Sequence, residues 1–398
     1  MSASLSVGQA LMTAAGKSTF ILGLVFAIAP LLVWAERRQS AMIQDRVGPH
    51  RASIRLFGRE WRFLGLLHPF ADSLKMVWKE DFVPPGADKI LHAFAPWISL
   101  APALLGLAII PFGPAIYFEH LGDTLMLSPE GVPCVAGLAS GVLGCTAAAS
   151  QLGTELQVAT LDAGILVFFA AGGLGVVGAA LGGYASNNKY SLLGGMRAAG
   201  QMVSYEVTLG LTLVGPLLVF GTLRPEEMVR WQSSSIFTWG FFLQPLAFVL
   251  YFVAAMAETK RVPFDVPEGE SELVGGYFTE YSGMKFGMFF FAEYVEVIGL
   301  AAIAATFFFG GWQIPLLTDA GFVVGQLHLP LSHGWVTALR VGGFVVKVLA
   351  LIWLQLMVRW SLPRFRYDQI MRLCWRYLLP LSLVNIVITF LVIVWLRS

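Results

Sequence analysis

The stretch 284–310, MKFGMFFFAEYVEVIGLAAIAATFFFG, decides the class of fold. It is longer than the roughly 20 apolar residues that a transmembrane helix needs, and its interior carries Glu293 and Glu296. At a rise of about 1.5 Å per residue, Glu293 falls near the midplane of a bilayer, with Glu296 one turn further on the same face. Because charge is costly in hydrocarbon, the stretch predicts a transmembrane helix with functional carboxylates.

The composition of the whole chain agrees with a bilayer as its solvent. Of its 398 residues, 57% are hydrophobic and 13% are charged, about half the charged fraction of soluble domains, and the mean hydropathy is +0.71. This excludes disordered, nucleic-acid-binding and collagen-like classes. Seven further stretches are predicted to span, the first of them lengthened by the mild residues before it: 20–34, 92–112, 162–184, 198–221, 236–257, 336–358 and 377–396.

We therefore predict an all-α polytopic membrane protein with about eight transmembrane helices. Residues 1–398 are expected to form one integral membrane domain. The first apolar stretch lacks a signal-peptide pattern and is expected to be retained as a span. A weakly apolar stretch, 132–150, is interpreted as part of a loop. Apolar residues at helical spacing within 63–78 predict an amphipathic helix that lies on the membrane surface or against a partner.

Lysine and arginine gather in alternate connections between the predicted spans. The segments 36–91, 185–201, 258–285 and 359–376 hold 20 of the 26. The positive-inside rule therefore places these connections in the cytoplasm and both termini outside, which agrees with an even number of spans. The long connection 113–161 has no lysine or arginine and fits the outer face.

Further ionisable side chains fall inside predicted spans or at their ends. Glu206 lies in the fourth span, Lys347 in the seventh and Asp162 at the start of the third. Carboxylates kept out of water can hold and release protons near neutral pH, so a water-bridged chain of them forms a proton path. The structural alternative is that each charge pairs with a neighbour and fixes the packing of the helices.

The loop 258–283, ETKRVPFDVPEGESELVGGYFTEYSG, is the densest polar feature. Its acids outnumber its two bases, Lys260 and Arg261. Pro263 and Pro267 prevent it from continuing the preceding span as a helix. Apolar and aromatic side chains are interleaved with the acids, which a solvated acidic loop does not need. The pattern favours a segment folded into a carboxylate-lined cavity over a free loop.

The sequence holds no motif of a soluble active site. It has no Walker A sequence, no GxGxxG and no nucleophile elbow, and its three cysteines have no CxxC spacing. We expect no bound metal, flavin or other redox centre in this chain. Two arginine-rich segments flank the spans. In 36–46, Arg38 is interpreted as an interfacial anchor, and the arginines of 359–369 are expected to pair with phospholipid or with the acidic loop.

Together these segments resemble the H-subunit family of bacterial respiratory complex I, the proton-pumping NADH:quinone oxidoreductase, whose mitochondrial counterpart is NADH dehydrogenase subunit 1. The motifs occur in the family's order and cover most of the chain outside 1–20, 50–66 and 113–160. They are ERR…QDRVGP (36–49), ADSLKMVWKED (71–81), SNNKYSLLGGMR (186–197), SYEV (204–207), AETKRVPFD…EGESELV (257–274), TEYSGMKF (279–286), AEY (292–294), GGW (310–312) and LPRFRYDQ (362–369).

The resemblance implies a subunit of a proton-translocating oxidoreductase in the bacterial cytoplasmic membrane, with ubiquinone or menaquinone as substrate. Its partners would be peripheral-arm subunits that flank the quinone site and hold the flavin and iron–sulfur clusters, small membrane-arm subunits and phospholipid, but no nucleic acid. By motif, the quinone tunnel and its entrance would involve Arg37, Arg46, Asp72, Arg261, Phe264 and Asp265. The proton path would involve Glu206, Glu258, Glu268, Glu270, Glu272, Glu280 and Glu293, with Asp162, Glu296 and Lys347 as additional buried charges.

Two insertions depart from the family pattern. One, at 52–63, lies at the expected mouth of the tunnel, and the other lengthens the outer connection 113–160. The residues leave two other classes open: the related membrane subunit of an energy-converting hydrogenase or of a ferredoxin- or F420-linked complex, and a stand-alone cation transporter. The intact PFD and EGESELV motifs favour the quinone-linked complex. The ten charges of 36–91 suggest docking to a partner, which a lone transporter does not need.

Overall fold

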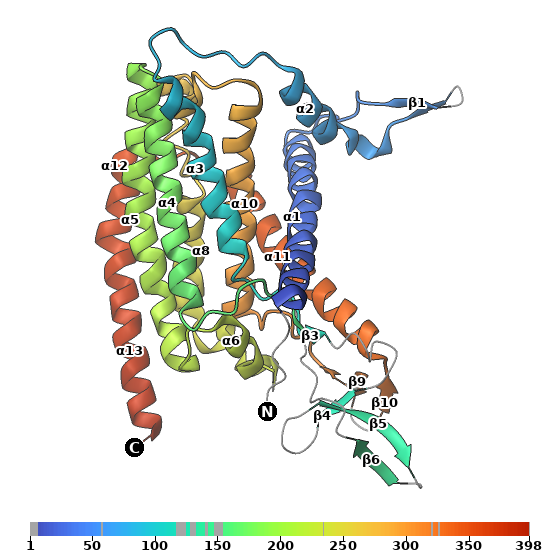
Figure 1. Cartoon of the computed structure of the whole chain (residues 1–398). Helices are drawn as coiled ribbons and strands as arrows, with labels where there is room; N and C mark the ends of the chain where they lie inside the picture. Colours follow the sequence, from blue (N-terminus) through green and yellow to red (C-terminus); the bar gives the residue numbers. More distant parts are fainter. Residues whose placement is uncertain are drawn as a thin grey trace.

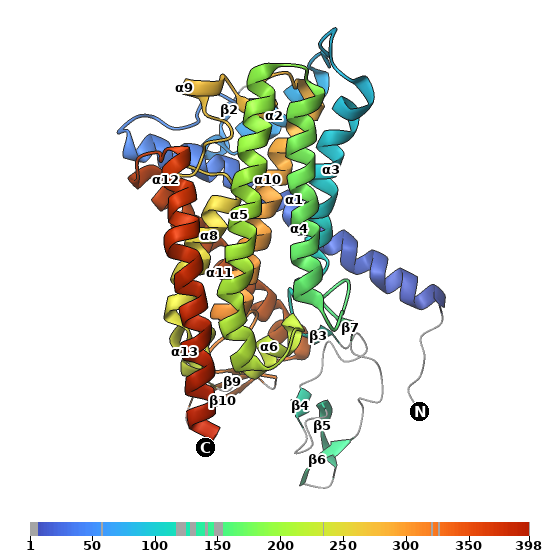
Figure 2. The same ribbon diagram turned by 90° about the vertical axis from the view of Figure 1, so that its left-hand side faces the viewer.

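A computed structural model of the chain describes residues 7–56, 59–116, 125–127, 133–139, 142–146, 154–233, 235–319, 321–324 and 327–397. Its long helices run side by side as a bundle, and the first helix begins at the same end of the bundle at which the last one finishes (Figures 1 and 2). We call this end the terminal end. The opposite end, which carries residues 44–88 and 259–282, is the loop end.

Seven helical segments in the described part of the chain are long and apolar enough to cross a membrane. They confirm the predicted all-α polytopic fold. They are α1 (Val7–Ile43), α3 (Lys89–Leu107), α4 (Gly164–Ala185), α5 (Lys189–Phe220), α10 (Gly283–Phe308), α11 (His333–Ser361) and a continuous run of α12 (Tyr367–Arg372), a π-helical turn (Leu373–Leu378) and α13 (Leu379–Arg397).

Helix α10, which contains the stretch quoted first, forms the core of the bundle. Within the apolar 18-residue stretch that identifies α10 as a candidate span, 83% is buried. The corresponding stretch of the helical run that includes α13 is only 22% buried. Small side chains such as Ala301, Ala302 and Ala305, all at most 1% exposed, allow neighbouring helices to approach closely. The two acids of α10 are therefore carried into the centre of the molecule.

The fifth predicted span, 236–257, is wrong as one continuous helix. It divides into a 3-10 turn (Ile236–Thr238), α7 (Gly240–Leu243) and α8 (Pro245–Glu258). Pro245 has no N–H to donate to the preceding turn, so α7 ends before it and α8 begins with it. Gln244 at the break donates to Thr389 of α13 at 2.9 Å and accepts from Asn385 at 3.1 Å.

The predicted amphipathic helix is present as α2 (Leu67–Trp78), which follows a 3-10 turn (Phe63–Gly65). Phe70, Leu74 and Val77 on α2 are more than half exposed. The insertion at 52–63 forms an antiparallel hairpin of β1 (Ile54–Leu56) and β2 (Arg59–Trp61). The hairpin projects away from the bundle at the loop end (Figure 1).

The described strands other than this hairpin lie at the terminal end, near the short helix α6 (Pro225–Trp231). The parts of 132–150 that the structure describes are strands, so they agree with a loop and not with a ninth helix. All pairs are antiparallel. β3 (Ala115–Ile116) pairs with β7 (Thr154–Glu155). β5 (Pro133–Ala139) lies between β4 (Leu125–Leu127) and β6 (Val142–Thr146), and β9 (Gly321–Val324) lies between β8 (Leu317–Thr318) and β10 (Leu327–Pro330).

Candidate functional site

The segment 259–282 folds into the loop end of the bundle, as the apolar residues among its acids predict. It contains two short turns, α9 (Glu270–Leu273) and a 3-10 turn (Gly276–Phe278). Phe264 is 4% exposed and Tyr277 is 1% exposed. Gln201 of α5 donates to the carbonyl oxygen of Phe264 at 2.8 Å and to that of Ala257 at 2.7 Å, which fixes the start of the segment.

Helix α5 approaches this segment at a glycine. A Cβ on Gly194 would lie 2.6 Å from the Cα of Gly276. Gly276 has a φ of +58°, in the left-handed region that favours glycine. The GG pair of the SNNKYSLLGGMR motif therefore allows direct contact between α5 and the backbone of the loop.

Lys260 places a buried positive charge beside the two acids of α10. Its side chain is 6% exposed. Its Nζ lies 3.9 Å from Oε1 of Glu293 and 4.0 Å from Oε2 of Glu296. Burial alone would lower the pKa of Lys260, but the Glu296 and Glu293 carboxylates raise it above its ordinary value. Lys260 is therefore charged at neutral pH.

Tyr277 completes this cluster from the loop. Its hydroxyl donates to Oε1 of Glu293 at 3.1 Å, and its ring centre lies 5.7 Å from Nζ of Lys260. Glu293 is 4% exposed. The Lys260 distances exceed those of a hydrogen bond, so the cation compensates the charge of the acids without contacting them.

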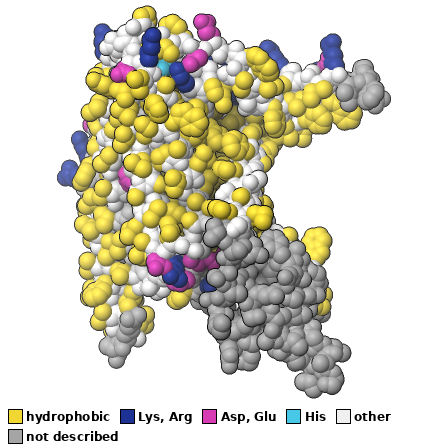
Figure 3. All heavy atoms as spheres, viewed as in Figure 1, with side chains coloured by type: hydrophobic (Ala, Val, Ile, Leu, Met, Phe, Trp, Pro, Cys, Tyr) yellow, Lys and Arg dark blue, Asp and Glu magenta, His cyan; other side chains and the backbone are white. Residues whose placement is uncertain are grey.

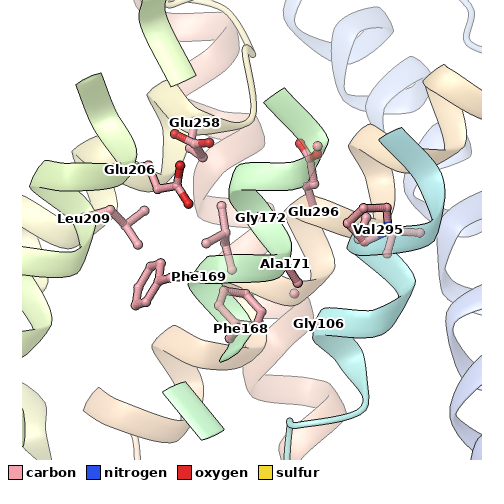
Figure 4. A pocket seen from close by; sticks show the side chains of 15 residues that line it. Gly106, Phe168, Phe169, Ala171, Gly172, Glu206, Leu209, Glu258, Val295 and Glu296 are labelled. Atoms are coloured by element: carbon pink, nitrogen blue, oxygen red, sulfur yellow. The ribbon is translucent and has the colours of Figure 1, made fainter. Parts of the chain in front are cut away.

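Carboxylates from three helices face one internal cavity of about 580 Å³. Glu206 comes from α5, Glu258 from the end of α8 and Glu296 from α10. Figure 4 shows Glu206 beside Glu258, with Glu296 farther along the cavity. We call this the acid cavity. Apolar side chains such as Phe168 and Leu209 form the rest of its wall.

Glycines of α4 make room for these carboxylates. A Cβ on Gly173 would lie 3.2 Å from Oε1 of Glu206, and one on Gly175 would lie 3.4 Å from Oε1 of Glu296. Gly172 and Gly175 also line the acid cavity. Side chains at these positions would press on the acids, so the AGGLG sequence at 171–175 shapes the cavity.

A second cluster lies around Glu36 of α1. Its Oε1 accepts from Nη1 of Arg261 at 2.9 Å, and its Oε2 accepts from the hydroxyl of Tyr294 at 2.5 Å. Arg359 of α11 forms an ion pair with the same carboxylate. We call these four residues the arginine cluster. Two guanidinium groups share one carboxylate here, so the cluster carries net positive charge.

The arginine cluster opens on a second cavity, whose space of about 360 Å³ is partly open to solvent. Glu36, Arg261 and Arg359 line one part of it. The remaining wall is mostly apolar and includes Leu32, Ile352 and Leu356. We call it the apolar cavity. It combines an apolar wall with N–H and O–H donors at one place.

The structure does not bring all six predicted quinone-tunnel residues together. Arg261 lines the apolar cavity, whereas Phe264 is buried with its ring 5.6 Å from that of Phe365. Arg37 and Asp72 form an ion pair of 2.6 Å, partly exposed, between α1 and α2. Arg46 is exposed, and Asp265 lies in the turn after Phe264.

The predicted proton-path acids fall into two groups. Glu206, Glu258 and Glu293 are in the acid cavity or in contact with Tyr277, as described above. The others lie in the loop or at its surface. Glu280 accepts from Asn188 at 2.7 Å, and Glu272 forms a 2.8 Å ion pair with Arg197. The side chain of Glu270 lies outside the described residues.

Glu268 lies in the loop between these two groups. Burial and the neighbouring Glu293 and Asp265 carboxylates raise the pKa of Glu268 well above its ordinary value. In contrast, the hydrogen bond from Arg197 lowers the pKa of the exposed Glu272. The segment therefore holds acids of differing proton affinity.

Two of the additional charges need correction. Asp162 is not buried: 86% of its side chain is exposed, and it pairs with Arg224 at the terminal end. It lies before α4 begins at Gly164. Lys347 is only partly buried and donates to the carbonyl oxygens of Phe309, Gly311 and Gln313 at 2.5–2.9 Å. It fixes the chain after α10, as the structural alternative predicts for this residue.

Sequence reasoning missed several residues of these clusters. Lys260 stood out only as one of two bases, and Glu36 and Tyr294 belonged to motifs without a role of their own. One signal was available, because Lys260 and Arg261 are the only bases in an acidic loop. No sequence pattern indicated which residues contact Glu36, because α1, α10 and α11 are far apart in the sequence.

The fold and its buried charges define a polytopic integral membrane protein. A family model described as NADH dehydrogenase matches residues 17–390. The chain belongs to this family, as the H subunit of complex I, and is thus part of an oxidoreductase complex with other complex I subunits as partners.

Curated relatives match over almost their whole length, and each is named as an H subunit of NADH-quinone oxidoreductase. The relative from Geobacter sulfurreducens is 42% identical over 375 residues, which is 94% of each chain. The relative from Koribacter versatilis is 39% identical over 386 residues, 96% of this chain and 98% of its own. The relative from Thermomicrobium roseum is 40% identical over 382 residues, 94% of each chain.

Proposed function

We propose that this chain lines the quinone-binding tunnel of a proton-pumping NADH:quinone oxidoreductase, next to the peripheral arm, and carries the first glutamate-rich proton path. The apolar cavity would belong to the tunnel and the acid cavity to the path. The names of the relatives favour this function over the hydrogenase-type and stand-alone transporter alternatives.

One observation carries the proposal. Lys260 and Arg261 are consecutive, yet Nζ of Lys260 lies 4.0 Å from Glu296, which lines the acid cavity, and Nη1 of Arg261 lies 2.9 Å from Glu36 beside the apolar cavity. A charge that changes at one cavity therefore acts on the other through a single turn of the loop. Both side chains are buried, where electrostatic interactions are screened less than in water.

The apolar cavity suits a quinone. A quinone has an apolar tail and two carbonyl oxygens that accept hydrogen bonds, and its reduction to quinol takes up two electrons and two protons. The arginine cluster offers donors for a carbonyl oxygen, and Leu32, Ile352 and Leu356 offer apolar contact for a tail. Electrons would come from carriers on other subunits.

We further propose that the loop end faces the cytoplasm, in the bacterial inner membrane, and that both termini lie outside. The basic connections that hold 20 of the 26 lysines and arginines support this orientation. The exposed apolar residues of α2 and the projecting β1–β2 hairpin would then face the peripheral arm or the membrane surface. The paired arginines at the loop end also suit contact with phospholipid headgroups.

The test is Arg261→Gln in the assembled complex, with Arg372→Gln on the exposed face of α12 as the matched control. Loss of a charge-assisted hydrogen bond predicts at least about a tenfold fall in quinone-linked turnover. NADH oxidation by an artificial acceptor, which bypasses the quinone, should be unchanged, as should both activities of the control. Equal loss of both activities in Arg261→Gln would indicate a role in assembly and contradict the quinone role.

A further inference from the structure

A third cavity, which neither proposed role uses, lies at the terminal end of the bundle. It measures about 1480 Å³, part of which is open to solvent, and its walls come from α6, α11 and the connections 111–115, 155–157 and 312–319. Figure 3 shows acidic and basic side chains gathered at this end of the molecule. We call it the terminal cavity.

The terminal cavity is separate from the acid cavity. Gly106 lines the acid cavity and Pro111 lines the terminal cavity. Between them in the chain, Leu107, Ile109 and Ile110 are at most 1% exposed. Because apolar, fully buried residues separate the two, the terminal cavity is a site of its own and its function is independent of the proton path.

Two of the acids that line the terminal cavity are already paired. Glu155 binds Arg230 at 2.6 Å, and Asp319 binds Arg340 at 2.5 Å. Glu226 differs from both. It is 6% exposed, and its Oε2 is buried with no hydrogen-bond partner among the described residues. Burial and the nearby Glu155 carboxylate raise the pKa of Glu226, whereas hydrogen bonds from its own backbone N–H and from the Gln157 side chain lower it.

A second unsatisfied acceptor lies in the same wall. Gln157 is 1% exposed, and its Oε1 is buried without a partner among the described residues. Its amide nitrogen donates to the carbonyl oxygens of Ile109 at 2.9 Å and Ala159 at 3.0 Å. These bonds fix the orientation of the amide, because a flipped amide would set oxygen against oxygen. The wall therefore holds two buried acceptor atoms without a partner among the described residues, Oε2 of Glu226 and Oε1 of Gln157, on side chains that are hydrogen-bonded neighbours.

The α11 side of the cavity offers the opposite chemistry. Arg340 is 6% exposed and uses Nη1 and Nη2 for Asp319 and the carbonyl oxygen of Leu317. Its buried Nε–H has no partner in the part of the chain that the structure describes. A ligand that satisfies both walls must carry N–H donors at one end and an anionic or carbonyl oxygen at the other.

The surroundings of the cavity suit a lipid. Helices α1 and α11 lie next to it, since Lys17 of α1 donates to the carbonyl oxygen of Gln157 at 3.2 Å. The terminal part of α11 exposes Trp335 and Leu339, at 67% and 37%. Tryptophan near a helix end is typical of the headgroup level of a membrane. Apolar side chains for acyl chains thus adjoin a polar cavity for a headgroup.

We propose that the terminal cavity binds the headgroup of a zwitterionic phospholipid with a primary ammonium, such as phosphatidylethanolamine. The ammonium donates to Glu226 and Gln157, and a phosphate oxygen accepts from Nε of Arg340. Phosphatidylcholine has the same net charge, but its quaternary ammonium has no N–H to donate. The site is therefore expected to select ethanolamine lipid over choline lipid.

The test uses the complete complex, stripped of lipid in detergent and then exposed to mixed micelles that contain phosphatidylethanolamine or phosphatidylcholine. Retained phospholipid per complex is measured by mass spectrometry. The native complex should retain the ethanolamine lipid with severalfold preference. Glu226→Gln should weaken this retention at least about tenfold, the effect of losing a charge-assisted hydrogen bond.

Glu227→Gln is the matched control, because Glu227 is the next residue of α6 and is already bonded to Thr222 and Arg224. It should retain lipid as the native complex does. Equal retention of the two lipids by the native complex, which requires no variant, would overturn the proposal, and so would equal behaviour of the two variants. Equal competition by soluble phosphoethanolamine would identify a soluble ligand instead. A carbodiimide cross-link from Glu226 to a lysine of another subunit would identify a protein occupant, and either result would overturn the lipid proposal.

Discussion

Lys260 and Arg261 are adjacent in the chain, but their side chains enter different buried clusters. Nζ of Lys260 lies 3.9 Å from Glu293, and Nη1 of Arg261 lies 2.9 Å from Glu36. The φ of +53° at Lys260 shows a tight turn at this point. Two consecutive residues therefore lie beside Glu293 on one side and the apolar cavity on the other. Displacement of one side chain is expected to displace the other through the backbone that they share.

Lys260→Met removes the buried cation from between Glu293 and Glu296. An uncompensated buried charge predicts a loss of about 3 kcal/mol in stability and a fall in the number of protons translocated per NADH. The thermal stability of the complex and proton uptake by vesicles measure the two effects. Lys285→Met is the control: its 2.8 Å pair with Asp81 is partly exposed, so about 0–1 kcal/mol is expected. Equal effects of the two variants would contradict a special role for Lys260.

Glu293→Gln keeps an acceptor for the Tyr277 hydroxyl but cannot release a proton. We expect proton pumping to fall more strongly than assembly or quinone-linked electron transfer. Acidification by reconstituted vesicles, normalised to NADH consumed, measures this ratio. Glu227→Gln alters a partly exposed acid that pairs with Arg224 at the terminal end, outside the proposed path, and serves as the control. Unchanged pumping in Glu293→Gln would remove this residue from the path.

Gly173→Ala adds a methyl group 3.2 Å from Oε1 of Glu206. Crowding of a packed site costs about 1–3 kcal/mol, and displacement of Glu206 should lower pumping severalfold. Gly210→Ala in α5 is the control, since a Cβ there meets nothing within 4 Å, and alanine favours the helix by up to about 1 kcal/mol. If Gly173→Ala pumps like the control, the glycine face of α4 does not shape the path.

Glu268→Gln should change the pH dependence of stability. Because the folded-state pKa of Glu268 is raised above its unfolded value, the native acid loses stability as pH rises from the unfolded pKa through the folded one. Glutamine mimics the protonated acid, so the variant should melt higher than the native complex above that window and equally below it. Thermal scans of both complexes over a pH series measure the difference. A constant difference at all pH values would show that Glu268 does not titrate in this way.

The orientation can be tested with a reporter enzyme that is active only outside the cytoplasm. A fusion to the C-terminus should be active, and a fusion after Ala87 at the loop end should be inactive. The expected pattern follows from the basic residues of the loop end. The reverse pattern would place the segment 259–282 outside the cytoplasm. It would thereby rule out contact between this segment and a cytoplasmic peripheral arm.

Much of the fold could be predicted because hydrophobic length alone specifies a membrane helix. The exception is the break at Gln244–Pro245, where Pro245 begins a new helix. No pattern in the sequence indicated that Thr389 and Asn385 of α13 would bind Gln244 at this break. Asp162 was misplaced for a similar reason. It lies just before α4, but the side chain is exposed and pairs with Arg224, a partner 62 residues away in the chain that the sequence did not indicate.

Sequence patterns were sufficient to predict a helical membrane protein and to identify the helices that carry acids. They also predicted that an acidic loop with buried apolar residues follows the fifth predicted span, 236–257. Apolar runs and charge asymmetry are local properties, so they need no knowledge of neighbours. The packing of the helices was needed to show that Glu36 contacts Arg261, Tyr294 and Arg359, that the Lys260 cation lies beside Glu293 and Glu296 of α10, and that Oε2 of Glu226 has no partner among the described residues. Such pairings depend on helices far apart in the chain, whose packing determines which charges share a cavity.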